Sequence, residues 1–183
     1  MIKKILFSIL IVLSSYTATF AQSNKTKEAK LEDPDNLASQ YFSQVMGVAV
    51  DATSNLKLYK FIYEWIGTPY RYGGNTKKGI DCSAFTKAIY DKVFNTNILR
   101  NSRDIFSMVD PLSRDELKEG DLVFFKIKSR SISHVGVYLG DNRFAHASVK
   151  GVRISNLNEP YYSRYFYKGG RILDPANKEF IEE

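Results

Sequence analysis

The chain has one cysteine, Cys82, among 183 residues. It therefore cannot form an internal disulfide, and in an oxidising compartment it is either a buried small hydrophobe, an intermolecular link or a reactive thiol. Histidine is nearly as scarce, with His134 and His146 as the two present. One cysteine and two histidines could supply three zinc ligands, but the sequence has no CxxC or HxxxH spacing and so argues against a zinc site.

Long hydrophobic runs are also missing. The apolar stretch ILFSILIVL covers residues 5–13, whereas a helix that crosses a membrane needs about 20 such residues. Lys3 and Lys4 precede the stretch and small residues follow it up to Ala21, which is typical of a cleavable signal peptide over residues 1–21. Since no cysteine follows the stretch to accept a lipid, we expect an exported protein, periplasmic or associated with the cell envelope, without stable membrane insertion after cleavage.

Aromatic residues are absent from residues 22–37, which are mostly polar and carry charges of both signs. Such a composition is typical of a flexible linker. Removal of the signal peptide would lower the net charge from +6 to +4, because it takes away two lysines and no acidic residue. This basicity suits an anionic partner such as the cell wall. The sequence predicts one domain over residues 38–174, without internal repeats, and a tail over residues 175–183.

Hydrophobic periodicity predicts helices in the first part of this domain. Between residues 38 and 66 the apolar positions recur at helical spacing and indicate two helices. The glycine-containing stretch over residues 67–75 is interpreted as a loop. A third helix is predicted over residues 82–94, with Asp81 as its N-cap, and a shorter one over residues 102–109.

After Pro111, short segments rich in β-branched and aromatic residues are separated by Gly, Asn, Asp or Ser, which predicts β-strands. Helices that precede a run of strands indicate an α+β fold, in which N-terminal helices pack on a central antiparallel sheet. Residues 126–131 and 161–168 mix basic and aromatic residues. We interpret them as an exposed loop and an aromatic strand, and no nucleic-acid recognition motif accompanies them. The predicted strands are 121–128, 134–140, 143–148, 151–155 and 170–173.

The lone cysteine lies in the first turn of its predicted helix, where unpaired N–H groups and the helix dipole lower the pKa of a thiol from about 8.5. His134 opens one predicted strand and His146 lies in the next. If the loop between these strands has an odd number of residues, Leu139 faces Arg143. His146 then lies opposite Gly136, on the same face as His134 and diagonal to it. A two-residue loop would place the imidazoles on opposite faces.

A nucleophile at a helix N-terminus, a histidine base on a strand and a polar group that orients the base form the arrangement of papain-like cysteine catalysis. The stretches GTPYRYGGNTKKGIDCSAF, LKEGDLVFFK, SHVGVYLGDNRFAHAS and NEPYYSRY resemble the NlpC-type cysteine peptidases of bacterial cell walls, in particular the murein endopeptidases of the Spr type. The likeness covers about residues 55–174. It implies a papain-like fold with Cys82 as nucleophile, His134 as general base and His146 as the residue that orients the base.

The resemblance also implies roles for residues around the nucleophile. Tyr70 would line the site and join the Cys82 backbone N–H in an oxyanion hole, because a tetrahedral intermediate requires hydrogen-bond donors. Asp81 and Ser83 would contact the peptide stem, although a helix cap and a first-turn residue explain them equally well. Family members that trim free stem peptides tend to carry Arg at the position of Ala84, so its absence favours endopeptidase action on cross-linked wall.

These residues predict a peptidoglycan hydrolase: a monomeric cysteine endopeptidase that cleaves amide bonds in the stems or cross-links of murein through a thioester, without a metal or organic cofactor. Two alternatives act on the same polymer, a γ-D-glutamyl-diamino acid peptidase and an N-acetylmuramoyl-L-alanine amidase. A third, of another class, is a non-catalytic wall-binding protein. The joint presence of Cys82, His134, His146 and Tyr70 argues against it, because binding alone needs none of them together.

Overall fold

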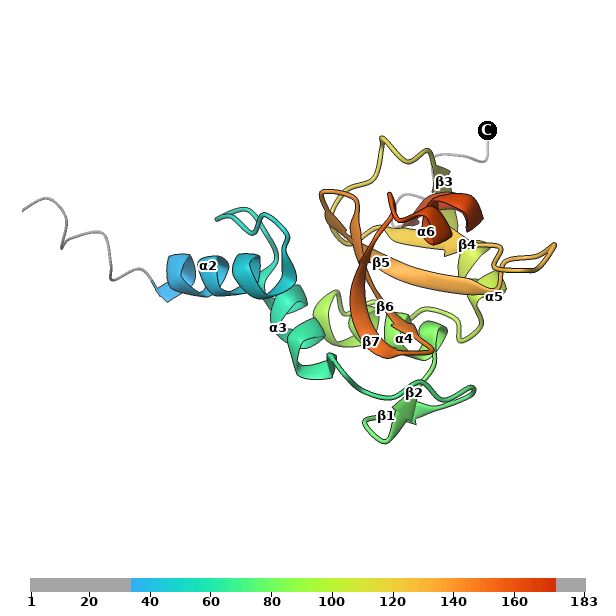
Figure 1. The fold of residues 1–183 in the computed structure, drawn as a ribbon, viewed down its shortest axis with the longest axis horizontal. Coiled ribbons are helices and arrows are strands. Elements are labelled where there is room, and N and C mark those ends of the chain that lie inside the picture. The colour runs from blue at the N-terminus through green and yellow to red at the C-terminus, as the bar shows by residue number, and fades with distance from the viewer. Residues whose placement is uncertain (1–33, 174–183) are drawn as a thin grey trace, which may run out of the picture. The chain divides into compact units, whose positions relative to one another are not determined.

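The computed structural model describes residues 34–173 (Figure 1). The expected signal peptide 1–21, residues 22–33 of the predicted linker and the expected tail 175–183 lie outside the described residues. Helix α2 (Pro34–Met46) begins within the predicted linker and takes in its last four residues. Proline suits this start, because its fixed φ and missing N–H fit the first turn of a helix. None of the helices among the described residues is long and apolar enough to cross a membrane.

The helices agree with the hydrophobic periodicity. The two predicted between residues 38 and 66 are confirmed as α2 and α3 (Leu56–Trp65). The helix predicted at the cysteine is confirmed as α4 (Cys82–Val93). The next helix is shorter than predicted and ends at Phe106, because Val109 already begins a β-strand. The later helices are α5 (Ser102–Phe106) and α6 (Pro160–Tyr165).

Six strands form one antiparallel sheet in the order β3-β8-β4-β5-β6-β7, which confirms the α+β class. A short hairpin of β1 and β2 precedes α4 and falls partly in the stretch predicted as a loop. The strands are β1 (Asn75–Thr76), β2 (Gly79–Ile80), β3 (Val109–Leu112), β4 (Leu122–Phe125), β5 (His134–Gly140), β6 (Arg143–Ser148), β7 (Gly151–Asn156) and β8 (Phe166–Ile172).

Strand β4 is shorter than the predicted segment 121–128 and ends at Phe125, and two further segments of the chain differ from the predicted strand pattern. Strand β3 is not among the predicted strands, since Pro111 within it reads as a break. Proline is tolerated there because β3 is one of the two edge strands of this sheet. The segment 161–168, predicted as a strand, is helical up to Tyr165 and becomes a strand only at Phe166. Pro160 occupies the first position of α6, where proline favours a helix start.

The turn between β5 and β6 contradicts the odd-numbered loop, in which Leu139 would face Arg143. Gly140 pairs with Arg143 instead, which leaves a two-residue loop. The two loop residues, Asp141 and Asn142, have positive φ angles of 49° and 59°. Tight two-residue hairpin turns need this left-handed conformation, and Asn and Asp adopt it more readily than most residues.

A β-bulge then corrects the register that this loop alone would give. The register shifts at Leu139, where one strand holds an extra residue. Beyond the bulge Val137 pairs with Ala145, so that His146 lies opposite Gly136. Both imidazoles therefore face the same side of the sheet, as predicted, but through a bulge rather than an odd loop.

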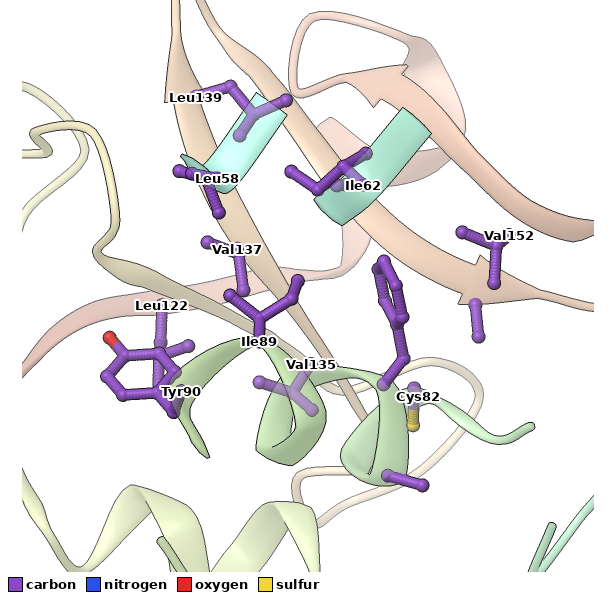
Figure 2. Close-up of a cluster of buried hydrophobic side chains, with 14 of the residues drawn as sticks. Leu58, Ile62, Cys82, Ile89, Tyr90, Leu122, Val135, Val137, Leu139 and Val152 are labelled. Carbon is purple, nitrogen blue, oxygen red and sulfur yellow. The ribbon is translucent and has the colours of Figure 1, made fainter. Parts of the chain in front are cut away.

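Hydrophobic side chains cover both faces of the sheet. On one face α4 packs against β5 and β6, and α3 packs against α4 with Leu58 and Ile62 in the same core (Figure 2). The other face carries the rings of Phe125 and Phe144, on which Tyr162 and Tyr165 of α6 pack. The helix that begins with the cysteine and the strands that carry the histidines thus share one packed core, which fixes their relative position. Buried side chains at the helical face include Leu58, Ile62, Ile89, Val135 and Val137.

Candidate active site

Cys82 is buried at the start of α4 (Figure 2). The backbone N–H of Val135 in β5 faces its sulfur and, with the N–H groups of Ser83 and of Cys82 itself, favours the thiolate form. Because Val135 directly follows His134, this contact ties the thiol to the strand that carries the first histidine. The structure therefore brings the predicted nucleophile next to the start of β5.

The two histidines are hydrogen-bonded to each other and almost completely buried. Nε2 of His134 lies 2.7 Å from Nδ1 of His146, and Nε2 of His146 lies 3.1 Å from the Ser155 hydroxyl oxygen. The tautomer in which His134 Nε2–H donates to His146 leaves Nδ1 of His134 to accept a proton. A Cβ on Gly136 would lie 3.2 Å from Cβ of His146 and 2.9 Å from the Ala145 oxygen, so glycine makes room at this crossing.

Aromatic rings hold the histidine pair in place. The ring centroid of His146 lies 4.7 Å from that of Phe144 and 5.3 Å from that of Tyr162, whose hydroxyl is 3.3 Å from Nε2 of His146. The His134 ring lies 5.8 Å from the Phe125 ring. Neither Tyr162 nor the Ser155 hydroxyl is among the predicted site residues, because both reach His146 only through long-range strand and helix packing.

Burial dominates the protonation of the thiol and of both imidazoles. It raises the pKa of Cys82 to about 11, against the opposing effect of the N–H donors at the sulfur. It also lowers the pKa of His134 to about 4, and lowers that of His146 with help from the neighbouring charges of His134 and Arg153. The expected lowering of the thiol pKa is therefore wrong for this structure, because desolvation outweighs the helix N-terminus. The resting pair is a neutral thiol and a neutral imidazole.

Tyr70 lies beside the thiol, in an isolated β-bridge with Ile80, the residue two positions before Cys82. Its pKa is raised, first by burial and then by the negative charges that Cys82 and Asp81 can carry. The Tyr70 hydroxyl therefore keeps its proton at neutral pH and stays a hydrogen-bond donor. This is the chemical property that its predicted oxyanion role requires.

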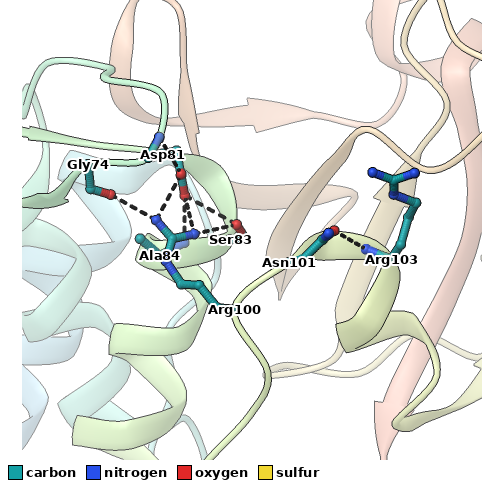
Figure 3. Close-up of polar contacts among 8 residues, drawn as sticks. Gly74, Asp81, Ser83, Ala84, Arg100, Asn101 and Arg103 are labelled. Carbon is teal, nitrogen blue, oxygen red and sulfur yellow. Dashed lines mark hydrogen bonds and ion pairs between the residues drawn. The ribbon is translucent and has the colours of Figure 1, made fainter.

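Arg100, which is not among the predicted site residues, forms a two-point ion pair with Asp81 (Figure 3). The two terminal nitrogens of Arg100 donate to the two carboxylate oxygens of Asp81 at 2.7 and 2.8 Å. One of them also donates to the Ser83 hydroxyl at 2.7 Å, and the other to the Gly74 carbonyl at 3.1 Å. Asp81 in addition caps α4 through the Ala84 N–H at 2.8 Å, which confirms the predicted cap.

This network decides the charge of Asp81. Burial alone would raise the pKa of its carboxyl, but the Arg100 guanidinium and the N–H groups of Ala84 and Gly73 lower it further than burial raises it. Asp81 is therefore a carboxylate whose acceptors are already occupied by the protein. Its contacts favour the reading of Asp81 as a cap and of Ser83 as a first-turn residue over direct contact with a substrate.

Two cavities lie at this site, one lined by Cys82 and the other by His134. One of about 550 Å³, here the cysteine-side cavity, is lined by Cys82 and mostly by polar side chains. The other, of about 620 Å³, is the histidine-side cavity and is lined by His134 with Tyr161 among its walls. Tyr70 and Ser133 line both. A chain-like ligand could therefore lie across the cysteine and histidine with one part in each cavity.

No group of three or more His, Cys, Asp or Glu side chains in residues 34–173 is placed to hold a metal ion. What the described part of the chain does hold is a thiol at a helix N-terminus that faces the start of β5, and a buried chain of two histidines and a serine that begins at His134 of the same strand. This geometry on an α+β scaffold defines a papain-like fold. Residues 67–171 match the NlpC/P60 family, and the chain belongs to that family.

Relatives support this assignment. Over 111 residues the chain is 46% identical to "Probable endopeptidase NlpC homolog" of Haemophilus influenzae and 42% identical to "Murein DD-endopeptidase MepS/Murein LD-carboxypeptidase" of Escherichia coli K12. Each match covers 60% of this chain and 58% of the relative, so the chain spans less than two thirds of their length. An NlpC/P60 family protein from Bacillus cereus is similar in structure, with a TM-score of 0.59 and 29% identity over 69% of this chain and 42% of that one.

Proposed function

We propose that this protein is an exported peptidoglycan hydrolase, a cysteine endopeptidase that cleaves amide bonds in the peptide stems or cross-links of murein. The observation that carries the proposal is the placement of the Cys82 thiol at the start of α4, facing the Val135 N–H of the strand that begins with His134, whose imidazole is hydrogen-bonded to His146. The name of the Escherichia coli relative, a murein DD-endopeptidase, supports the choice of polymer and of bond.

The proposed reaction begins from the neutral pair. The Cys82 sulfur attacks the carbonyl carbon while His134 Nδ1 takes the thiol proton, and the proton then passes to the leaving amine as the C–N bond breaks. The resulting thioester is hydrolysed by a water molecule whose proton is taken by His134 and returned to the sulfur. Tyr70 and the Cys82 N–H donate hydrogen bonds to the oxyanion in both steps.

His146 acts in this scheme by orienting the base. Its Nδ1 accepts the hydrogen bond from His134 Nε2–H, and Ser155 in turn accepts from its Nε2–H. This order fixes the tautomer of His134 whose Nδ1 is unprotonated. It also disperses the positive charge that His134 gains during attack, in a site where burial otherwise opposes that charge.

Digestion of purified murein sacculi tests the proposal. We expect the wild-type protein to release soluble fragments whose masses show loss of peptide cross-links, and the Cys82→Ala variant, checked for folding by circular dichroism, to release none. Fragments in which D-glutamate has a free γ-carboxyl and the diamino acid has a new free α-amine would indicate the γ-D-glutamyl peptidase instead, and stem peptides freed from the sugar would indicate the amidase. A folded wild-type protein that binds sacculi but cuts no bond would support the wall-binding alternative.

A further inference from the structure

A second arginine lines the cysteine-side cavity and is not engaged by the protein. Arg100 and Arg103 both line this cavity, three residues apart. Figure 3 shows dashed lines converging on the Arg100 guanidinium, whereas the one line to Arg103 ends at its backbone nitrogen, which donates to the Asn101 side chain at 3.0 Å. Within residues 34–173 the Arg103 guanidinium makes no hydrogen bond or ion pair.

The remaining charges of this cavity cancel. Its other charged lining residues are Asp81 and Arg100, which form a two-point ion pair with each other. The thiol of Cys82 is neutral because burial raises its pKa. Arg103 is thus the uncompensated charge in the lining of a cavity that also holds the proposed nucleophile.

Such a cation selects a ligand of definite chemistry. A guanidinium presents a planar fork of N–H donors that matches a carboxylate in two-point fashion, and it stays charged at any physiological pH. Peptide stems of murein carry free carboxylates on D-glutamate and on the diamino acid, within one or two residues of the amide bonds that the proposed function would cleave. A cavity of about 550 Å³ has room for one such residue beside the thiol.

We propose that Arg103 is a specificity residue that binds a carboxylate of the peptide stem in the cysteine-side cavity, so that the enzyme prefers stems with that carboxylate over stems in which it is amidated. The inference rests on the proposed function and narrows its substrate. Arg103 touches neither the thiol nor the imidazole in this role. It strengthens binding of the stem and fixes the position of the stem along the cleft.

The proposal is tested by measuring kcat/KM for several enzyme variants on matched free and amidated substrates. The enzymes are wild type, Arg103→Gln, Arg103→Lys and the control Lys60→Gln, which removes an exposed cation of α3 outside both cavities. The substrates are one cross-linked muropeptide with free carboxylates and two versions amidated at D-glutamate or at the diamino acid. We expect wild type to prefer the free form over one amidated form by about 10-fold in kcat/KM, mainly through KM, as for a charged hydrogen bond.

In these measurements Arg103→Gln should abolish the preference, Arg103→Lys should keep part of it because it keeps the charge without the fork, and Lys60→Gln should keep all of it. If Arg103→Gln slows both substrates equally, or keeps the wild-type preference, the proposal is wrong. Binding of the same stems to the Cys82→Ala variant, with and without Arg103→Gln, gives a readout without turnover. Absence of cleavage by the wild type would count against the proposed function alone, whereas equal binding of free and amidated stems would overturn the role of Arg103.

Discussion

The two halves of the site are held by different forces. On the cysteine side, a partly exposed ion pair joins Arg100 to Asp81 and ties the glycine-containing loop at Gly74 to the start of α4. On the histidine side, buried aromatic rings pack around the imidazoles, and the polar atoms bond only to each other and to buried or half-buried hydroxyls. A polar network thus holds the helix start that carries the proposed nucleophile, and packing across the sheet holds the proposed base.

This difference has an energetic consequence. An ion pair with one partly exposed partner contributes little to folding, because water screens it. A buried ring such as Phe144 contributes several kcal/mol through apolar burial and packing. Damage to the cysteine side should therefore reduce activity with little loss of stability, whereas damage to the histidine side should reduce both.

The largest effect is expected at the nucleophile itself. Cys82→Ala should lower the rate of murein cleavage by at least about 10³-fold, as removal of a catalytic nucleophile does. Its melting temperature should stay close to that of the wild type, since only a sulfur atom at the edge of the core is lost. Zymography and muropeptide analysis measure the cleavage rate, and calorimetry measures the melting temperature. Substantial cleavage by the folded variant would rule out the thiol mechanism.

Replacement of the orienting histidine comes next. His146→Ala should lower kcat by about 10²-fold, at the low end of the effects of general acid–base groups. His146→Asn and His146→Gln should retain more activity, because a side-chain oxygen can accept from His134 Nε2–H. Ser155→Ala serves as the milder control, since it removes the second link of the chain and leaves the imidazole pair. Equal loss in the Ala, Asn and Gln variants would contradict an orienting role.

A matched pair of variants compares the two halves directly. Phe144→Ala should lower the free energy of unfolding by about 3–5 kcal/mol, because it leaves a cavity beside His146. Arg100→Gln should cost about 1 kcal/mol, because the Arg100 side chain is 41% exposed, yet should reduce kcat by loosening the start of α4. Chemical denaturation of both variants checks this order. A larger stability loss in Arg100→Gln would show that the network, not the packing, holds the site.

The last prediction is a pH dependence of stability. The pKa of His134 is about 4 in the folded chain and about 6.5 when unfolded. Between these values the unfolded chain binds a proton that the folded chain does not, so stability falls as pH drops from about 6.5 towards 4 and is unaffected by this group above 6.5. Melting temperatures at pH 7, 6 and 5 should decrease, and the decrease should be smaller in His134→Gln. An unchanged slope in that variant would show that His134 is not buried in its neutral form.

The sequence allowed the cysteine side to be predicted more completely than the histidine side. The helix at Cys82 and its cap at Asp81 depend on neighbouring residues, and both are confirmed. The strands of His134 and His146 are also confirmed, but the loop that joins them is not. A two-residue turn followed by a bulge gives the same register beyond the bulge as a loop with an odd number of residues. No local sequence pattern distinguishes these two ways of joining the strands.

Partners from distant parts of the chain could not be predicted. Arg100 reaches Asp81 across 19 residues, and Ser155 reaches His146 from the next strand. The pKa of the thiol could not be predicted for the same reason. Its position at a helix N-terminus is visible in the sequence, but its burial against β5 depends on the folded core, and burial has the larger effect.

Trapping of the acyl-enzyme tests the central claim most directly. If Cys82 forms a thioester with the stem peptide, added hydroxylamine should intercept it and convert part of the acyl product from a carboxylic acid to a hydroxamate. The hydroxamate fraction should rise with hydroxylamine concentration, while Cys82→Ala should form none. Mass spectrometry of the products from a cross-linked muropeptide distinguishes the hydroxamate from the carboxylic acid. Cleavage that yields only the carboxylic acid at every hydroxylamine concentration would contradict a covalent cysteine mechanism.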